Sequence, residues 1–382
     1  MQTCDAVIVG GGLIGGSIAF ELARRNLGVV VLDRQQPGRE ASWAAAGMLS
    51  PAPDTPASIP LVPLGRASLG LYPQFVSAVE DASGLRTGYR AEGTLEVLFR
   101  GDAERELSTL VALYRGLGIA CEPLPVEEAR AMEPMLGRDV SGAAFLTDEA
   151  SVDNRTLTDA VLAAAQASGA TLRPGVEVTS LVRDGAKCAG VKASDGKTIL
   201  AAQVVLAAGC WSSQLSDVAA YAPTFPVRGQ MIALRHNGQP IRRVLRSERG
   251  YLVPRDHARP QRVVAGSTIE NAGYEKRVTS GGIEKILSAV NELAPELAEA
   301  EIVETWSGLR PGTPDQLPIL GPTEMEGLVM ATGHYRNGIL LAPVTAKLIS
   351  EWIIERRTSV DWERFSPSRF GRSVSNRLAA TP

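Results

Sequence analysis

The hydrophobic positions near the start of the chain follow two kinds of pattern. A short apolar run at residues 5–9 is typical of a buried parallel strand, and Val29–Leu32 repeats it. Between the two runs, apolar residues recur every four positions, which predicts a helix over Leu13–Arg25. Strand, helix and strand in this order predict a βαβ unit, and therefore a parallel sheet.

The same patterns recur along the rest of the chain. They predict further helices at residues 64–82, 102–117, 153–167, 283–293 and 338–356. They predict further strands at residues 91–99, 171–173, 176–182, 188–193, 199–206, 301–306 and 327–333, with several more pieces within 224–270. Residues 35–60 are rich in proline and small residues and are read as a loop.

The order of these elements predicts an interrupted domain. Elements of the nucleotide-binding kind occur at the start, the middle and the end of the chain, and other material is inserted twice. We expect an α/β fold in which a Rossmann-like domain with a parallel sheet is interrupted by a substrate domain with a mixed or antiparallel sheet. The first would comprise residues 1–85, 145–223 and 318–365, the second 86–144 and 224–317, and 366–382 would form a C-terminal tail.

A glycine motif lies where the first strand meets the first helix. In Gly10-x-Gly12-x-x-Gly15, the first glycine permits a tight turn, the second lets the backbone approach a pyrophosphate, and the third lets the helix lie close to the sheet. The pyrophosphate would meet free N–H groups at a helix N-terminus. Asp33, after the next apolar run, is placed to accept hydrogen bonds from a ribose. The motif predicts a dinucleotide, which by itself leaves NAD, NADP and FAD open.

The composition excludes several classes of protein. The chain has 382 residues, of which 45% are hydrophobic and 21% charged, as in ordinary globular proteins. A formal net charge of −3 gives no electrostatic footprint for nucleic acid. Four cysteines are widely scattered and no metal-ligand spacing is present, so we expect reduced thiols, no metal and a cytoplasmic location. No signal peptide is expected, because the stretch before the first strand is too short to hold one, and no membrane span is expected, because the apolar residues 6–20 are broken by glycines.

Six segments are distinctive in content and order: Val9–Gly16, Ala41–Pro51, Ala207–Ser212, Pro226–Gln230, Gly308–Asp315 and Gly333–Pro343. Together they resemble the D-amino-acid oxidase family of FAD-dependent amine oxidoreductases, and within it the glycine oxidases of the thiamine pathway. The resemblance extends over about residues 5–355. It implies FAD as the cofactor and a homo-oligomer, a homotetramer in the family.

The resemblance also implies that FAD is held along its whole length. The glycine motif would hold the adenine half, the small residues after Asp33 would pass beneath the flavin, and the glycine turn at Gly333 would place a helix N-terminus near the ring. The cofactor-binding residues are then Gly10, Gly12, Leu13, Ile14, Gly15, Asp33, Arg34, Ser42, Ala45, Ala46, Gly47, Met48, Val178, Ala208, Gly209, Trp211, Gly333, His334, Arg336, Asn337, Gly338, Ile339 and Leu340. No cysteine follows Cys210, so we expect non-covalent FAD.

Substrates of this family have a carboxylate and an amine, and three residues are candidates to act on them. Arg310 lies in an otherwise apolar stretch, and a planar guanidinium binds a carboxylate through two parallel hydrogen bonds. The alternative for Arg310 is a structural salt bridge. Tyr251 would donate its hydroxyl to the same carboxylate, with strand packing as the alternative, and Arg336 would supply a second positive charge.

Three other residues have a weaker connection to the substrate site. Arg249 is a weaker candidate, for which a solvated surface position is the favoured interpretation. Arg228 lies in one of the six segments and is interpreted as structural. Ile269 is a candidate for the wall of the substrate pocket.

The implied reaction is oxidative deamination of glycine, other small amines or D-amino acids. Hydride transfer to FAD would give a 2-oxo acid and ammonia, and O2 would be reduced to H2O2. One alternative is a D-amino-acid or secondary-amine dehydrogenase, acting on sarcosine-like or proline-like substrates and using another acceptor. A tRNA-modifying enzyme is disfavoured by the slightly acidic charge. A non-catalytic nucleotide-binding protein would leave Arg310 and Tyr251 without a role.

Overall fold

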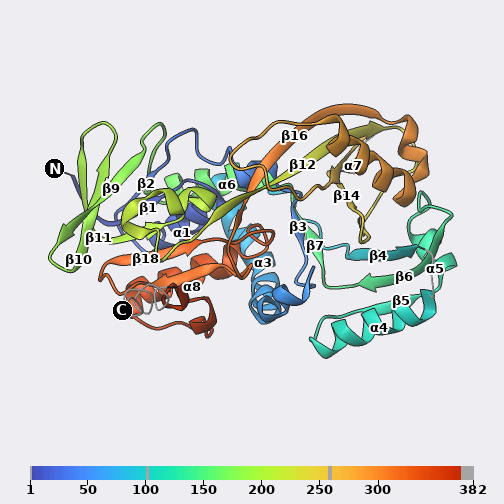
Figure 1. Ribbon diagram of the computed structural model, residues 1–382, viewed down its shortest axis with the longest axis horizontal. Helices are drawn as coiled ribbons and strands as arrows, with labels where there is room; N and C mark the ends of the chain where they lie inside the picture. Colours follow the sequence, from blue (N-terminus) through green and yellow to red (C-terminus); the bar gives the residue numbers. More distant parts are fainter. Residues whose placement is uncertain (1, 100–102, 257–259, 371–382) are drawn as a thin grey trace, which may run out of the picture.

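The computed structural model describes residues 2–99, 103–256 and 260–370, which fold around two large sheets toward opposite ends of the molecule (Figure 1). In the first sheet the strand order is β17–β18–β11–β1–β2–β8; β10 also pairs with β11, and β9 pairs with β10. Its strands are β1 (Gln2–Val9), β2 (Val29–Leu32), β8 (Thr171–Arg173), β9 (Val178–Asp184), β10 (Lys187–Ala193), β11 (Thr198–Leu206), β17 (Ile319–Pro322) and β18 (Leu328–Thr332).

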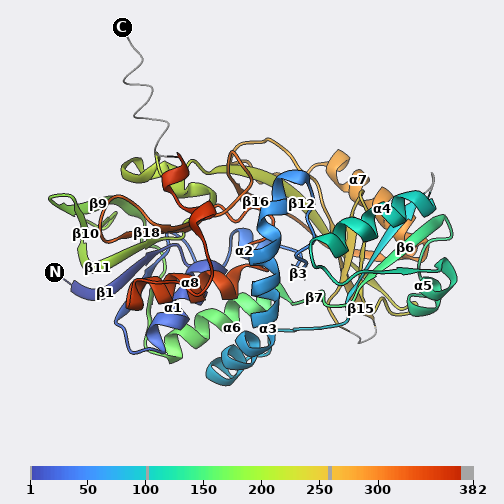
Figure 2. The same ribbon diagram turned by 90° about the horizontal axis from the view of Figure 1, so that it is seen from below.

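The centre of the first sheet is parallel and buried on both faces. β1 pairs in parallel with β11 on one side and with β2 on the other. Ala6 and Ile8 of β1 pack with a group of helices, whereas Val7 and Val9 pack with apolar residues of β9 and β10. The helices gather along one face (Figure 2) and are α1 (Leu13–Ala23), α3 (Val62–Ser83), α6 (Asn154–Ala167) and α8 (Ala342–Glu355).

The second sheet is mostly antiparallel, with the order β16–β12–β15–β14–β13–β4–β6–β5. Its strands are β4 (Thr94–Phe99), β5 (Glu122–Leu124), β6 (Val140–Leu146), β12 (Phe225–His236), β13 (Val244–Arg246), β14 (Tyr251–Pro254), β15 (Gln261–Gly266) and β16 (Glu301–Gly312). Helix α7 (Ser280–Leu293) packs on it, and α4 (Ala103–Gly116) and α5 (Val126–Met132) lie at its far end (Figure 1).

Short elements join the two sheets. β3 (Met48–Leu49) pairs with β7 (Ala150–Ser151) between them. The remaining short elements are α2 (Ala41–Ala44), η1 (Pro56–Leu61), η2 (Gly209–Gln214), η3 (Ser216–Val218), η4 (Pro295–Glu299) and η5 (Glu363–Phe365). The long strands β12 and β16 reach back from the second sheet and contact η2, which follows a strand of the first sheet.

The predicted βαβ unit is present, and the α/β class is confirmed. Residues 35–60 are not a loop throughout, because α2, β3 and η1 fall within them. The strand expected at 301–306 continues to Gly312, because it pairs with β12 along its whole length. The last helix begins at Ala342 rather than at 338, and the strand β6 and the helix α5 were not expected.

The domain boundaries stay a prediction. The strands of the first sheet and those of the second come from alternating parts of the chain, which is the arrangement that motivated the division. Residue 102 of the helix predicted at 102–117 and residues 371–382 of the predicted tail lie outside the described residues.

The first and third glycines of the motif are required by close backbone contacts. Gly10 has φ +107°, and a Cβ there would collide with the carbonyl oxygen of Ala207. A Cβ on Gly15 would collide with the carbonyl oxygen of Gly10, so α1 can cross β1 this closely only if position 15 has no side chain.

We therefore expect Gly15→Ala to lower the free energy of unfolding, by about 1–3 kcal/mol, which is typical of overpacking. Gly70→Ala is the matched control. Gly70 is an exposed residue within α3 with no neighbouring heavy atom within 4 Å of a built Cβ, so alanine there should stabilise the protein by about 0.5–1 kcal/mol. Urea unfolding of both variants measures the difference, and equal stability of the two would contradict this account.

Candidate active site

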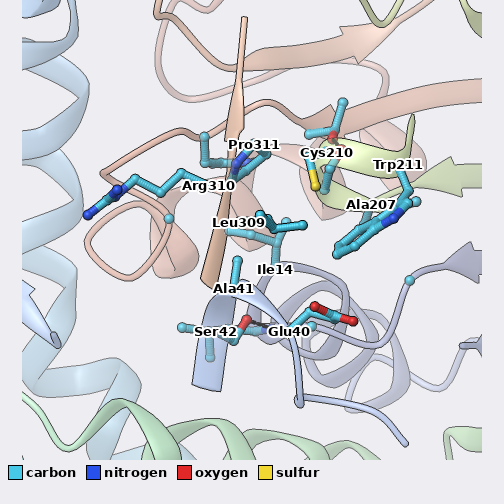
Figure 3. Close-up of a pocket in the computed structure, with 18 of the residues that line it drawn as sticks. Ile14, Glu40, Ala41, Ser42, Ala207, Cys210, Trp211, Leu309, Arg310 and Pro311 are labelled. Carbon is cyan, nitrogen blue, oxygen red and sulfur yellow. Dashed lines mark hydrogen bonds between the residues drawn. The ribbon is translucent and has the colours of Figure 1, made fainter. Parts of the chain in front are cut away.

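A long cavity of about 530 Å³ lies where the two sheets meet. Its wall includes the turn before α1, the segment from Gly38 to Met48, the start of β9, the end of β11 with η2, and parts of β12 and β16. Figure 3 shows residues of α2, of η2 and of β16 around the same space. The volume is that of a pocket that encloses a small molecule or cofactor.

The N-terminus of α1 opens toward this cavity. Ser42 Oγ accepts a hydrogen bond from the N–H of Leu13 at 2.9 Å, although the two residues are far apart in sequence. Asp33 Oδ2 accepts from the N–H of Gly11 at 2.8 Å, which fixes the carboxylate beside the glycine turn. The first N–H groups of a helix have no acceptor within the helix and lie at the positive end of its dipole. This end of the cavity is therefore suited to bind a pyrophosphate.

The backbone around α2 is held by a buried amide. Asn154 Nδ2 donates to the carbonyl oxygens of Ser42 and Trp43 at 2.7 and 2.9 Å. Arg255 Nη2 donates to Asn154 Oδ1 at 2.7 Å, and its Nη1 donates to the carbonyl oxygen of Val152 at 2.9 Å. These bonds fix the small-residue segment against both α6 and the second sheet.

Aromatic and cationic side chains support the same segment. The Arg155 guanidinium lies 3.6 Å from the ring centroid of Trp43 and 4.7 Å from that of Trp306. Trp306 Nε1 donates to the carbonyl oxygen of Ala44 at 3.0 Å. A Cβ on Gly308 would collide with Ala44 Cβ, so small residues on both strand and helix permit this approach.

The opposite wall of the cavity contains an arginine over a tryptophan ring and a neutral cysteine thiol. The Arg34 guanidinium lies 4.2 Å from the ring centroid of Trp211. Burial raises the pKa of the Cys210 thiol to about 12, so this cysteine is protonated at neutral pH. Val176, Val178 and their neighbours line the wall nearby.

Arg310 lies at the β16 side of the cavity and has neutral partners. Its Nη1 donates to the carbonyl oxygen of Thr268 at 3.0 Å and its Nη2 to Ser267 Oγ at 2.8 Å. Across the ladder it pairs with Val227, and a Cβ on the nearby Gly229 would occupy the place of the guanidinium. Among the described residues Arg310 forms no ion pair, which argues against the structural salt bridge considered above.

Burial and three neighbouring side chains set the electrostatic surroundings of Arg310. Burial lowers the pKa of its guanidinium, and so does the positive charge of Arg336, whereas the nearby Tyr251 and Tyr335 raise it. An arginine remains charged in a protein in spite of such shifts. Tyr251 is buried, and its hydroxyl lies 3.3 Å from Met231 Sδ. A half-buried positive charge beside a hydroxyl and without an acidic partner suits the carboxylate of a small ligand.

Most of the residues predicted to bind the cofactor or the substrate share this cavity. Arg310, Tyr251 and Arg336 all line it. The predicted cofactor-binding residues that line it are Gly10, Gly12, Leu13, Ile14, Asp33, Arg34, Ser42, Ala45, Ala46, Gly47, Met48, Val178, Ala208, Gly209, Trp211, His334, Arg336, Gly338 and Ile339. Their roles stay predictions.

A few of the named residues lie elsewhere. Gly15, Gly333, Asn337 and Leu340 are outside the cavity wall; the last two border a small second hollow beside Pro51. Ile269 is 58% exposed and does not line the cavity. Arg249 pairs with Glu292 at the surface, and Arg228 is buried and pairs with Glu270.

Several residues of the site were not expected from the sequence. Gly229 and Met231 line the cavity from β12, and Glu40 and Tyr335 also line it. Asn154, which contacts the α2 backbone, is another; Asp153 caps its helix by accepting from the N–H groups of Arg155 and Thr156. The positive φ of Tyr335, 48°, is visible only in the folded backbone.

Comparison with known proteins agrees with this geometry. The family model described as FAD dependent oxidoreductase matches residues 5–352. The chain belongs to this family.

Several named proteins are similar to this chain along most of its length. A glycine oxidase of Geobacillus kaustophilus is 34% identical, over 96% of this chain and 97% of the relative. The crystal structure of glycine oxidase from the same organism matches with a TM-score of 0.90 and 33% identity, covering 97% of this chain and 99% of that one. A bifunctional protein ThiO/ThiG of Trichormus variabilis is 37% identical over 98% of this chain. The chain spans only about half of that relative's length, 56%.

The cavity fits the FAD that defines the family. A Cβ on Gly209 would meet no neighbouring atom within 4 Å, and one on Gly12 would approach Ser42 Oγ at 3.2 Å, so glycine keeps space free on the cavity wall. Within the described ranges, no helix is both long and apolar enough to cross a membrane. The same residues contain no cluster of three or more side chains suited to hold a metal ion.

We expect Asn154→Ala to weaken FAD binding, because the carbonyl oxygen of Ser42 loses its side-chain donor and that of Trp43 keeps only the longer bond from Arg155 Nε at 3.3 Å. Leaving buried polar groups without partners costs about 1–3 kcal/mol, which corresponds to a roughly 5- to 150-fold rise in the dissociation constant if the α2 segment must be reordered on binding. Flavin fluorescence on titration of apoprotein measures this constant. Thr156→Ala, an exposed change in the same helical turn, is the control, and a similar effect of both substitutions would contradict the role of Asn154.

A second prediction concerns His334, which is buried beside the cavity with Nε2 3.1 Å from Thr345 Oγ1. Burial lowers the pKa of His334 to about 3, so the folded protein holds it neutral. Below about pH 6.5 the unfolded chain binds a proton at this histidine that the folded chain does not bind. Lowering the pH therefore lowers the free energy of unfolding, by up to about 1.4 kcal/mol per pH unit.

Unfolding of the holoprotein at pH 7 and pH 5 tests this dependence. Between these pH values the wild type should lose about 2 kcal/mol more stability than His334→Gln, which has no titrating group at this position. Equal losses in the two proteins would show that His334 contributes nothing to the acid sensitivity.

Proposed function

We propose that this protein catalyses the oxidative deamination of glycine and other small amines or D-amino acids. The observation that supports this most directly is the single cavity that contains both the glycine-motif end of α1 and the guanidinium of Arg310, which is free of any acidic partner in the described chain. The similarity to proteins named glycine oxidase along almost the whole chain supports the same substrate.

The protein's own residues would bind and orient the substrate. The guanidinium of Arg310 would donate two hydrogen bonds to the substrate carboxylate, and the buried hydroxyl of Tyr251 would donate to the same carboxylate. This fixes the direction of the Cα–H bond, and positioning of this kind contributes up to roughly 7–11 kcal/mol to lowering a barrier. The wall of small residues around α2 would bring the backbone close to the ring and exclude water.

Bound FAD supplies the two-electron acceptor for hydride transfer from Cα. The imine left from glycine would be hydrolysed to glyoxylate and ammonia, and we propose O2 as the final acceptor, with release of H2O2. Non-covalent FAD and a cytoplasmic location, which the cysteines predict, are part of the same proposal. So are a homotetramer and a role in the thiamine pathway, which the sequence resemblance implies.

The experiment that tests the proposal is anaerobic addition of glycine to the purified protein. A flavin spectrum that glycine bleaches, followed by O2 uptake with H2O2 release on mixing with air, is the expected result. Reduction that is reversed only by an artificial acceptor would favour the dehydrogenase alternative. A colourless protein that takes up no FAD would contradict both.

Arg310→Ala should raise the glycine concentration needed for half-maximal rate roughly 10- to 150-fold, because it removes a charge-assisted hydrogen-bonded pair worth about 1.5–3 kcal/mol. Arg249→Ala removes a surface arginine and serves as the matched control. Steady-state H2O2 release at varied glycine measures both. An unchanged KM in Arg310→Ala would exclude this residue as the carboxylate site.

A further inference from the structure

Two of the arginines that line the cavity, Arg310 and Arg336, have different kinds of partner. Arg310 has only neutral hydrogen-bond partners in the described chain. Arg336 Nε, in contrast, lies 3.3 Å from Asp54 Oδ2. The two arginines are close enough for the charge of Arg336 to contribute to lowering the pKa of Arg310. A carboxylate bound at Arg310 would therefore lie near a second cation that is already paired.

Asp54 is held in place by a stiff loop. It lies between β3 and η1 in the stretch Pro51-Ala52-Pro53-Asp54-Thr55-Pro56, where three prolines restrict the backbone. The N–H of Thr55 donates to Ser58 Oγ at 3.2 Å, and the N–H of Ser58 donates to the carbonyl oxygen of Thr55 at 3.0 Å. Little conformational freedom remains to be lost when the carboxylate of Asp54 pairs with Arg336.

The pair between Asp54 and Arg336 is partly sheltered from water. The side chain of Arg336 is 24% exposed and that of Asp54 is 34% exposed. A second carboxylate on a substrate would compete with Asp54 for the guanidinium of Arg336, and it would meet the negative charge of Asp54 on approach. Discrimination against a ligand by a like charge is a common device of specific binding sites.

We propose that Asp54 is a specificity-determining residue that occupies Arg336 and so excludes substrates with a second carboxylate. The inference rests on the proposed function and refines it: the substrate class is amines with one carboxylate, which Arg310 binds. Asp54 acts through Arg336 and takes no part in the reaction itself.

Sarcosine and iminodiacetate form a matched pair of substrates, because replacing the N-methyl group of one by an N-carboxymethyl group gives the other. We compare kcat/KM for the two in the holoenzyme by H2O2 release, or by reduction of an artificial acceptor. In Asp54→Asn the ratio of iminodiacetate to sarcosine should rise at least tenfold. Combining it with Arg336→Gln should return the ratio to the wild-type value.

Asp159→Asn is the matched control. Arg39 lines the cavity just before α2, and its Nη2 lies 3.3 Å from Asp159 Oδ1. The substitution therefore also removes the acidic partner of an arginine on the cavity wall. This variant should keep the wild-type ratio. An unchanged ratio in Asp54→Asn, or an equal rise in Asp159→Asn, would overturn the inference.

Binding of non-substrates separates this inference from the proposed function. Acetate and malonate also differ by one carboxylate, and their dissociation constants follow from changes in the visible flavin spectrum of the oxidised holoenzyme. Asp54→Asn should favour malonate at least tenfold relative to the wild type, whether or not glycine is oxidised. Unchanged relative affinities would overturn the role of Asp54, and failure of glycine to reduce the flavin would overturn only the proposed function.

Discussion

The site depends on the antiparallel pairing of β12 with β16. Both strands are twelve residues long, and they remain paired from the second sheet to the edge of the cavity. The register sets Val227 opposite Arg310 and Gly229 opposite Gly308. One glycine leaves room for the guanidinium of Arg310 and the other leaves room for Ala44. A shift of one residue would turn these side chains to the opposite face of the sheet.

The same pairing connects the two parts of the cavity. Trp306 of β16 donates to the carbonyl oxygen of Ala44, and Arg155 at the start of α6 lies over the rings of both Trp43 and Trp306. The segment that the resemblance places beneath the flavin is therefore fixed by the start of α6 and by the second sheet. The helix dipole at α1 and the guanidinium at β16 keep their positions relative to each other because this segment lies between them.

The charges along the cavity are unequal in a way that suits the proposed chemistry. His334 and Cys210 are held neutral by burial, and the charge of Arg336 is balanced by Asp54. The hydrogen-bond partners of Arg310 in the described chain are a carbonyl oxygen and a hydroxyl, and nearby tyrosines add to the stabilisation of its charge. A half-buried cation without an acidic partner is costly for folding, and a ligand carboxylate offsets that cost when it binds.

The sequence by itself determined the local features of this protein. Periodicity predicted the βαβ unit, and the glycine spacing together with Asp33 predicted a dinucleotide site, because these depend on backbone geometry within about 30 residues. The family resemblance pointed to Arg310 and to the segment after Asp33, although spacing alone did not. The helix α2, the extension of β16 and the strand β6 were missed, since each depends on a partner that is distant in the sequence.

Only the tertiary structure decided which side chains meet. Asn154 contacts the carbonyl oxygens of Ser42 and Trp43 across more than 100 residues, and Asp54 meets Arg336 across an even longer separation. Hydrophobic periodicity reports which face of an element is buried, and it contains no information about the partner of a polar side chain. That partner is set by strand register and by the packing of the two sheets, which is why a proline-rich stretch read as a loop supplies the carboxylate beside the site.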